Sequence, residues 1–139
     1  MTGNIAPEPL ADALQDIEQA MPRFARWLYR TVRQDLGDRV LDAGAGIGTY
    51  TDLLLDDGRA VVSLESDPTF AEHLRQRFAG NQRVTVYRAD LADGGGLPDF
   101  PEVDSALCLN VLEHIEDDVQ AIRNLHARVR PGGTLVALV

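Results

Sequence analysis

Residues 40–48, Val-Leu-Asp-Ala-Gly-Ala-Gly-Ile-Gly, decide the fold because they join a short apolar run to three glycines at alternate positions. Glycine lets the backbone turn sharply and leaves no side chain where a ligand must approach. The helix expected at 49–56 begins with unpaired amides and with the positive end of its dipole. This stretch predicts a strand, a tight turn that holds a ligand, and a helix.

An acidic residue follows at a spacing that suits a nucleoside. Glu65 comes directly after the next apolar run, 60–64, and stands 21 residues after Gly44. A carboxylate there can accept hydrogen bonds from both vicinal hydroxyls of a ribose. The dinucleotide fingerprint needs a glycine at position 49, where this chain has Thr49. Thr49 therefore disfavours a dinucleotide, and a plain strand-to-helix turn stays open as the alternative.

The rest of the chain alternates short apolar runs with helical patterns. Strands are expected at 39–43, 60–64, 83–88, 103–110 and 134–139. Asp67 and Pro68 form a helix start, and Glu116 or Asp117 caps a later helix. The inner stripe of that later helix is expected to consist of Val119, Ile122, Leu125 and Val129. Strands alternating with crossover helices predict an α/β fold with a parallel, doubly wound sheet over residues 37–139.

The N-terminal part has a different texture. Residues 1–9 are interpreted as a flexible leader and residues 10–36 as a helical segment. Pro22 marks a kink or the first turn of a new helix. The helical pattern after Pro22 has an apolar stripe on one face, at Phe24, Trp27, Leu28, Thr31 and Val32. The opposite face carries an arginine stripe at Arg23, Arg26, Arg30 and Arg33.

Composition narrows the classes of function. The 139 residues carry a formal net charge of −9, with 45% hydrophobic and 25% charged residues, which is typical of a globular domain. The acidic balance argues against binding to a nucleic-acid backbone or to an acidic membrane surface. Cys108 is the single cysteine, so an internal disulfide is excluded. No secretory signal pattern or apolar run of about 18 residues occurs, so a cytoplasmic location is expected.

The glycine turn resembles motif I of the class I S-adenosylmethionine-dependent methyltransferases. Three further segments resemble that family in the same order: 88–91, Arg-Ala-Asp-Leu; 109–115, Leu-Asn-Val-Leu-Glu-His-Ile; and 128–135, Arg-Val-Arg-Pro-Gly-Gly-Thr-Leu. The resemblance covers roughly the last hundred residues and implies a Rossmann-like fold. The segment 109–115 is similar to the small-molecule branch of the family.

The resemblance also implies a cofactor site for S-adenosylmethionine. The glycines would line the methionine moiety, Glu65 would hold the ribose, and the adenine would lie against Asp90 and Leu91. Asn110 would lie near the amino-acid end, and Asp42 would take the ammonium group directly or through water, with a turn or cap acid as the alternative for Asp42 and Asp90. The expected cofactor-binding set is Asp42, Gly44, Gly46, Gly48, Glu65, Ser66, Asp90, Leu91 and Asn110.

Methyl transfer from a sulfonium needs aligned reactants more than it needs a metal or a covalent nucleophile. His114 follows the fourth strand and is the expected catalytic base for a hydroxyl or amine acceptor, with structural packing as the alternative. No metal is expected, because helix capping explains the acidic residues at 116–118. Trp27 and Tyr29 are expected to form part of a lid over the cofactor, with core packing as the alternative for Trp27.

The family fold has seven strands, whereas this chain stops within the fifth. The expectation is either a fragment of a longer protein or an exposed edge strand covered by a second copy. Methyl transfer to a small molecule is the preferred function. The alternatives are a module that binds S-adenosylmethionine without catalysis and, less favoured because of Thr49, an NAD-dependent oxidoreductase. Family members that methylate the amino groups of nucleic acids carry two prolines and an aromatic residue after the corresponding position. Here Val111 and Leu112 follow Asn110, so the resemblance disfavours a DNA base as acceptor.

Overall fold

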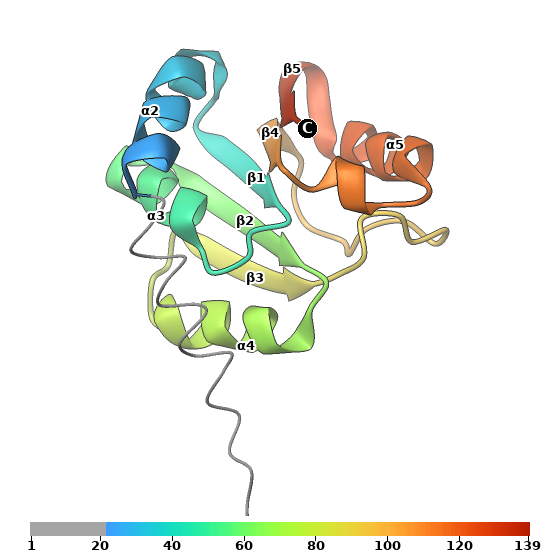
Figure 1. Ribbon diagram of the computed structural model, residues 1–139, viewed down its shortest axis with the longest axis horizontal. Helices are drawn as coiled ribbons and strands as arrows, with labels where there is room; N and C mark the ends of the chain where they lie inside the picture. Colours follow the sequence, from blue (N-terminus) through green and yellow to red (C-terminus); the bar gives the residue numbers. More distant parts are fainter. Residues whose placement is uncertain (1–21) are drawn as a thin grey trace, which may run out of the picture.

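A computed structural model describes residues 22–139, so the leader at 1–9 and the helix expected from Leu10 lie outside the described residues. Five strands form one sheet in which all neighbours are parallel, in the order β3-β2-β1-β4-β5 (Figure 1). The strands are β1 (Arg39–Ala43), β2 (Ala60–Glu65), β3 (Val84–Arg88), β4 (Val103–Leu109) and β5 (Val129–Leu138).

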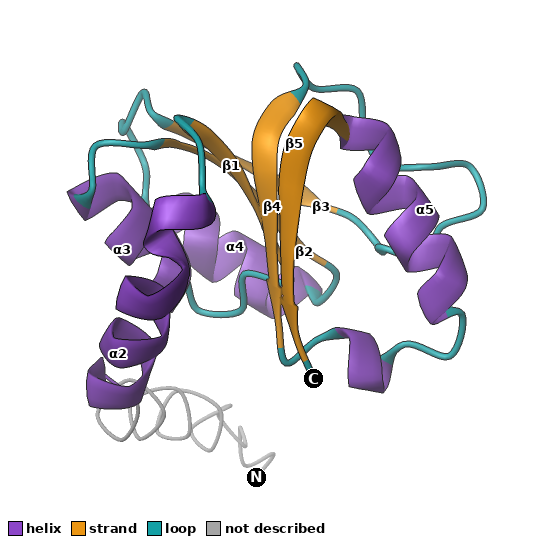
Figure 2. Cartoon of the chain, turned by 90° about the horizontal axis from the view of Figure 1, so that it is seen from above, coloured by secondary structure: helices purple, strands orange, loops and turns teal. Residues whose placement is uncertain are grey.

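Helices cover both faces of the sheet, which confirms the doubly wound α/β fold. One face carries α2 (Pro22–Val32), α3 (Thr49–Asp56) and α4 (Pro68–Arg77), and the other carries α5 (Asp118–Arg128) (Figure 2). Two 3-10 turns, η1 (Arg33–Asp35) and η2 (Leu112–His114), complete the described elements. Among residues 22–139, no helix is long and apolar enough to cross a membrane.

The core has two layers because successive side chains of a strand point to opposite faces. Val40 packs with Leu54 and Leu74 on the α3 side of the sheet, whereas Leu41 packs with Leu125 on the α5 side. All five side chains are fully buried. Burial of each contributes about 1.5–3 kcal/mol.

Helix starts follow the sequence prediction. The Asp67 carboxylate accepts hydrogen bonds from the amides of Thr69 and Phe70 at 2.8 and 3.1 Å, and Pro68 opens α4. Asp117, not Glu116, caps α5 by accepting a bond from the Gln120 amide at 3.0 Å. α2 is described from Pro22 onward, so the choice between a kink and a helix start at Pro22 stays a prediction, because the residues before it lie outside the described part of the chain.

The inner stripe predicted for α5 is wrong in three positions, one of which, Val129, lies in β5 beyond the end of the helix. Val119 and Ile122 are exposed, whereas Ala121, Asn124 and Leu125 are buried. Asn124 occupies the inner face because its amide makes hydrogen bonds there, and this turns the helix so that Val119 and Ile122 face outward.

The aromatic residues of α2 are also placed differently from the prediction. Phe24 and Trp27 are exposed, so the core-packing alternative for Trp27 is wrong. Tyr29 is buried instead, because its hydroxyl donates to the Asp57 carboxylate at 2.9 Å. This bond ties α2 to the end of α3.

The fifth strand begins at Val129 rather than at Thr134, and residues 131–133 do not form the helix-ending turn that the sequence predicted. Val103 pairs with Val129 and Ser105 pairs with Thr134, so extra residues of β5 bulge out between these two pairs. A bulge absorbs the proline, which cannot donate to the ladder.

Candidate functional site

The functional site is built where β1 and β4 lie side by side. The chain leaves β1 toward the α3 face and leaves β4 toward the α5 face, so the two connections diverge and open a crevice at the carboxyl ends of the strands. A cleft of about 410 Å³ occupies this position. Its lining residues are Gly44, Gly46, Leu64, Glu65, Ser66, Asp67, Phe70, Ala89, Asp90, Leu91, Asn110, Val111, His114 and Ile115.

The glycine loop forms one wall of the cleft. The amides of Gly44 and Ala45 both donate to the Leu64 carbonyl at 2.9 Å, which fastens the loop to β2. A Cβ atom on Gly44 would lie 2.4 Å from Val111 Cγ2, so this glycine permits the contact between the loop and the segment after β4. Gly46 has φ +57°, and a Cβ there would meet no atom within 4 Å. Gly46 therefore leaves open space, as close approach of a ligand requires.

Gly48 lies close to the C-terminal end of α4, and its predicted place beside the methionine moiety stays a prediction. It is the N-cap of α3 with φ +93°, and a Cβ would lie 2.8 Å from Phe78 Cε2 and 2.9 Å from Leu74 Cδ2. It does not line the cleft. Its geometry serves the contact between the loop and the C-terminal end of α4.

Glu65 joins the two loops at the cleft wall. Its Oε2 accepts a hydrogen bond from the Gly46 amide at 2.8 Å, and its Oε1 accepts one from the Asp67 amide at 2.9 Å. The residue is 9% exposed and lines the cleft. Because a carboxylate has about four acceptor sites, each oxygen can still accept a bond from a ligand hydroxyl.

Asp42 lies beneath the loop, outside the lining of the cleft. It is 3% exposed, and its carboxylate accepts a hydrogen bond from Thr51 Oγ1 at 2.7 Å; Thr51 Oγ1 also lies 2.8 Å from Ser63 Oγ. Burial raises the pKa of Asp42 to about 6, the Thr51 hydrogen bond lowers it, and the charge of Glu65 raises it. The arrangement supports a structural anchor, and a role for Asp42 toward an ammonium group stays a prediction.

Sequence reasoning missed Thr51 and Ser63. The available signal was a polar residue inside an apolar strand, since Ser63 stands directly opposite Asp42 in the register of β1 and β2. A buried hydroxyl beside a buried carboxylate is expected, because a buried carboxylate needs a donor.

The opposite wall comes from the segment after β3. Leu91 is buried, whereas Asp90 is exposed and its Oδ1 accepts a hydrogen bond from the Ala92 amide at 2.9 Å. Ser66 is exposed at the same cleft. The structure therefore brings Glu65, Ser66, Asp90 and Leu91 to one cavity, although they follow two different strands.

Asn110 and His114 border the cleft after β4. Asn110 is the non-glycine residue with positive φ (+55°) in the described chain, and its amide donates to the Leu138 carbonyl at 2.8 Å. The His114 side chain is 78% exposed, and its Nε2 lies 3.9 Å from Glu113 Oε1. This exposure removes the core-packing alternative for His114 and leaves its imidazole accessible from the cleft.

No group of three His, Cys, Asp or Glu side chains within residues 22–139 is arranged to hold a metal ion. Cys108 is fully buried, and burial raises the pKa of its thiol to about 11, so it is protonated near neutral pH. The polar side chains that line the cleft include the carboxylates of Glu65 and Asp90, the amide of Asn110 and the imidazole of His114.

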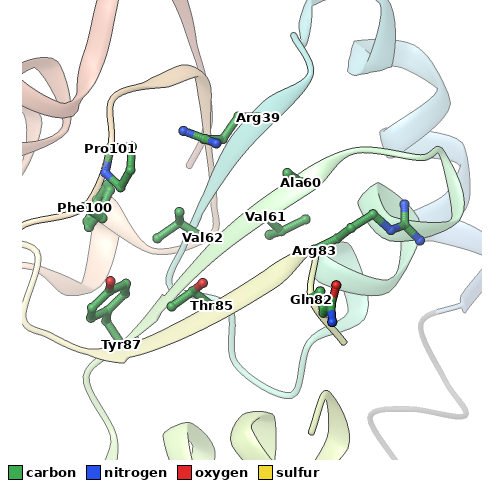
Figure 3. Close-up of a pocket in the computed structure, with 10 residues that line it drawn as sticks. All are labelled: Arg39, Ala60, Val61, Val62, Gln82, Arg83, Thr85, Tyr87, Phe100 and Pro101. Atoms are coloured by element: carbon green, nitrogen blue, oxygen red, sulfur yellow. The ribbon is translucent and has the colours of Figure 1, made fainter. Parts of the chain in front are cut away.

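A second hollow of about 150 Å³ lies on the α5 side of the sheet, near the start of β1 and β2 (Figure 3). Arg39, Val62, Thr85 and Tyr87 line it together with Phe100. It lies away from the glycine loop and the carboxyl ends of the strands, where open parallel sheets place their ligands. The 410 Å³ cleft is the better candidate site.

Known proteins are similar to this chain in sequence or in fold. A protein of Mycolicibacterium smegmatis named a probable S-adenosylmethionine-dependent methyltransferase is 34% identical over 107 residues, covering 77% of this chain and 40% of that protein. The ubiquinone biosynthesis O-methyltransferase of Xanthomonas campestris pv. campestris is 27% identical over 71% of this chain and 41% of its own length. The crystal structure of the cyclase SpnF has the same fold, with a TM-score of 0.69 and 22% identity, and covers 86% of this chain and 44% of that one.

The chain thus spans about 40% of the length of the curated relatives that it matches. Residues 41–135, from β1 to β5, match the family described as methyltransferase domain. This span contains the glycine loop, Glu65, Asp90 and the segment 109–115. The family expected from the sequence is confirmed, and the chain belongs to the methyltransferase domain family.

Proposed function

We propose that the cleft binds S-adenosylmethionine and that the protein transfers its methyl group to a small molecule. The observation that carries the proposal is Glu65, whose two carboxylate oxygens are fixed by the amides of Gly46 and Asp67 at the cleft wall. This fixed pair of acceptors is suited to two adjacent ribose hydroxyls. The relative from Mycolicibacterium smegmatis supports the same cofactor by its name.

The residues present fit the cofactor. The cleft volume of about 410 Å³ falls within the range of roughly 300–1,000 Å³ for small-molecule sites. The open space above Gly46 can receive the amino-acid part, and Asp90 with the Leu91 backbone can hold the adenine on the opposite wall. In this arrangement the carboxylate of Glu65 lies between the two ends of the ligand.

The cofactor supplies a methyl group on a positively charged sulfur. The protein's part is to orient this group toward the acceptor and to receive the proton that a hydroxyl or amine acceptor loses. His114 brings an imidazole to the cleft, and imidazole is the side chain that most often takes up such a proton. His114→Ala is expected to slow turnover and to leave cofactor affinity unchanged; normal turnover would contradict the assignment.

The charges of the cleft lining and of the whole chain favour a small-molecule acceptor. Of the described residues that line the cleft, none is Lys or Arg, and the chain as a whole carries a net charge of −9. A site for nucleic acid needs cations against the phosphates. The name of the Xanthomonas relative, an O-methyltransferase of ubiquinone biosynthesis, points in the same direction. A cytoplasmic location stays a prediction.

Isothermal titration tests cofactor binding directly. S-adenosylmethionine and S-adenosylhomocysteine are expected to bind with micromolar affinity, and NADH serves as the control for a dinucleotide site. Glu65→Ala is expected to weaken binding at least tenfold, whereas Glu72→Ala, an exposed carboxylate on α4, leaves it unchanged. A folded chain that binds neither ligand, or that binds NADH better, would overturn the proposal.

A second candidate is a module that binds the cofactor without methyl transfer. The cyclase SpnF has this fold under a name that denotes a different reaction, so the fold alone does not specify methyl transfer. The two candidates are separated by incubation of the protein with labelled S-adenosylmethionine and candidate phenols or amines. Label in a product supports the first candidate; ligand binding without transfer to any acceptor supports the second.

A further inference from the structure

Asn124 is a buried amide on the inner face of α5, where an apolar residue would be expected. It is 7% exposed, and its Nδ2 donates hydrogen bonds to the carbonyls of Leu91 at 2.7 Å and Asp93 at 2.8 Å. Its Oδ1 accepts a bond from Gln120 Nε2 at 2.9 Å, one turn earlier on the same helix. The Gln120 bond fixes the orientation of the amide, so both N–H groups point at the loop.

The two carbonyls belong to the segment that walls the cleft. This segment, 89–102, joins β3 to β4 without a helix or strand of its own. It is shaped by local turns, in which the Asp90 carboxylate accepts from Ala92 and the Asp93 carboxylate accepts from Gly95. Asn124 is the side chain that connects residues 91–93 to a packed helix.

The energetics favour a fixed position for these residues. A buried carbonyl that loses its donor costs about 1–3 kcal/mol. Asn124 is the donor to the carbonyl of the buried Leu91, whereas the Asp93 carbonyl also accepts a bond from the Gly96 amide at 3.1 Å. Leu91 is itself buried next to the cleft, so a shift of its carbonyl moves the backbone that borders the ligand. The position of the wall therefore depends on α5, an element that does not line the cleft.

We infer that Asn124 is a positioning residue that holds Asp90 and Leu91 where they distinguish adenine from other bases. The inference rests on the proposed function. Adenine presents an amino donor and a ring-nitrogen acceptor on one edge, which match a carboxylate and a backbone N–H. Hypoxanthine reverses both groups, so it is mismatched to the same wall. Base preference thus requires the Asp90 carboxylate and the Leu91 amide to keep their relative position.

Arg128 provides a matched control, because it lies on the same helix as Asn124 and contacts the same loop. Its Nη2 donates to the Leu97 carbonyl at 2.8 Å, and its Nη1 lies 3.2 Å from the Asp99 carboxylate. Neither Leu97 nor Asp99 lines the cleft. Loss of Arg128 therefore loosens the far part of the loop and leaves the wall at Asp90 and Leu91 in place.

The test measures the ratio of two affinities by isothermal titration, for S-adenosylhomocysteine and for S-inosylhomocysteine, its hypoxanthine analogue. Asn124→Ala is expected to weaken S-adenosylhomocysteine binding at least tenfold and to reduce the preference for adenine at least fivefold. Arg128→Ala is expected to preserve the ratio within twofold. A general loss of stability lowers both affinities together and leaves the ratio unchanged.

An unchanged ratio in a folded Asn124→Ala variant would overturn the inference. If that variant does not fold, Gln120→Ala decides, because it removes only the group that orients the amide; it is expected to lower the ratio at least twofold, and a wild-type ratio would overturn the inference. Failure of the wild-type chain to bind either ligand would instead overturn the proposed function, which keeps the two failures distinct.

Discussion

The buried carboxylate of Asp42 destabilises the folded protein, and the hydrogen bonds of its neighbours offset only part of this effect. Burial raises its pKa to about 6 from an ordinary value of 3.8. Between these two values the folded protein holds more protons than the unfolded chain, so stability falls as the pH rises from about 4 to 6. Above pH 6 the penalty is complete and amounts to about 3 kcal/mol.

Asp42→Asn is expected to raise the free energy of unfolding at pH 7.5, by up to about 3 kcal/mol. The amide oxygen can still accept the hydrogen bond from Thr51 while the buried charge is removed. Urea unfolding of both proteins at pH 4 and pH 7.5 measures the effect, which should be larger at pH 7.5. Asp56→Asn, at an exposed position of α3, is the control. A variant that is destabilised equally at both pH values would contradict this account.

Individual side chains were the least predictable from the sequence. Asn124 and Ser63 are buried for the sake of hydrogen bonds, which hydrophobic periodicity does not reveal. Trp27 is exposed and Tyr29 buried on the same helix, because the Tyr29 hydroxyl has a partner in Asp57, 28 residues later. Such choices depend on atoms that are distant in the chain.

At the scale of elements, two glycines of the loop after β1 serve different purposes: one matters for stability and the other for ligand binding. Gly46 and Gly48 both have positive φ, but only a Cβ on Gly48 would meet other atoms. Gly48→Ala is expected to cost about 2–4 kcal/mol of stability, from backbone strain together with the clash against Leu74 and Phe78. Gly46→Ala is expected to cost only about 1–2 kcal/mol, from backbone strain alone.

In ligand affinity the two variants should rank the other way, with the larger loss in Gly46→Ala. The Cβ of Gly46→Ala enters the space assigned to the ligand, so S-adenosylhomocysteine is expected to bind at least tenfold more weakly. Folded Gly48→Ala is expected to bind within threefold of the wild type. Thermal unfolding and titration of both variants provide the two measurements, and an equal loss of affinity in the two variants would speak against the placement of the ligand.

Elements were largely predictable, because strands and helices follow local patterns. Residues 39–43 and 49–56 form β1 and α3 with the expected bounds. The start of β5 differs because Val129 already pairs with Val103. Residues 130–133 have no partner in the register with β4, and Gly132 has φ +78°, so the Pro-Gly-Gly sequence still interrupts the pairing before Thr134.

At the scale of the whole molecule, an apolar surface extends over α5 and β5. Ile122 and Leu135 are 42% and 38% exposed and line the same hollow of about 430 Å³, and Val119 is exposed nearby on α5. Exposed apolar patches and open strand edges promote association. The 139-residue chain is therefore expected to self-associate as its concentration rises.

Sedimentation velocity at increasing concentration measures this association. Ile122→Lys combined with Leu135→Lys is expected to shift the chain toward monomer without loss of the folded state. Gln82→Lys is the control. Gln82 is an exposed polar residue before β3, so the variant adds a charge at the edge of the sheet opposite to β5. A chain that stays monomeric at all concentrations would refute the prediction.

The order of strands in the sheet also governs how the chain folds. β1 is central, yet Leu41 finds its partner Ala106 on β4 only 65 residues later. At a synthesis rate of roughly 5–20 residues per second, that partner is made about 3–13 seconds after Leu41. During this interval the nascent chain can pair β1 with β2 and β2 with β3, but the β4 side of β1 stays unpaired. The wide sequence separation of these contacts makes folding slow, and the growing chain is exposed to misassociation until β4 arrives.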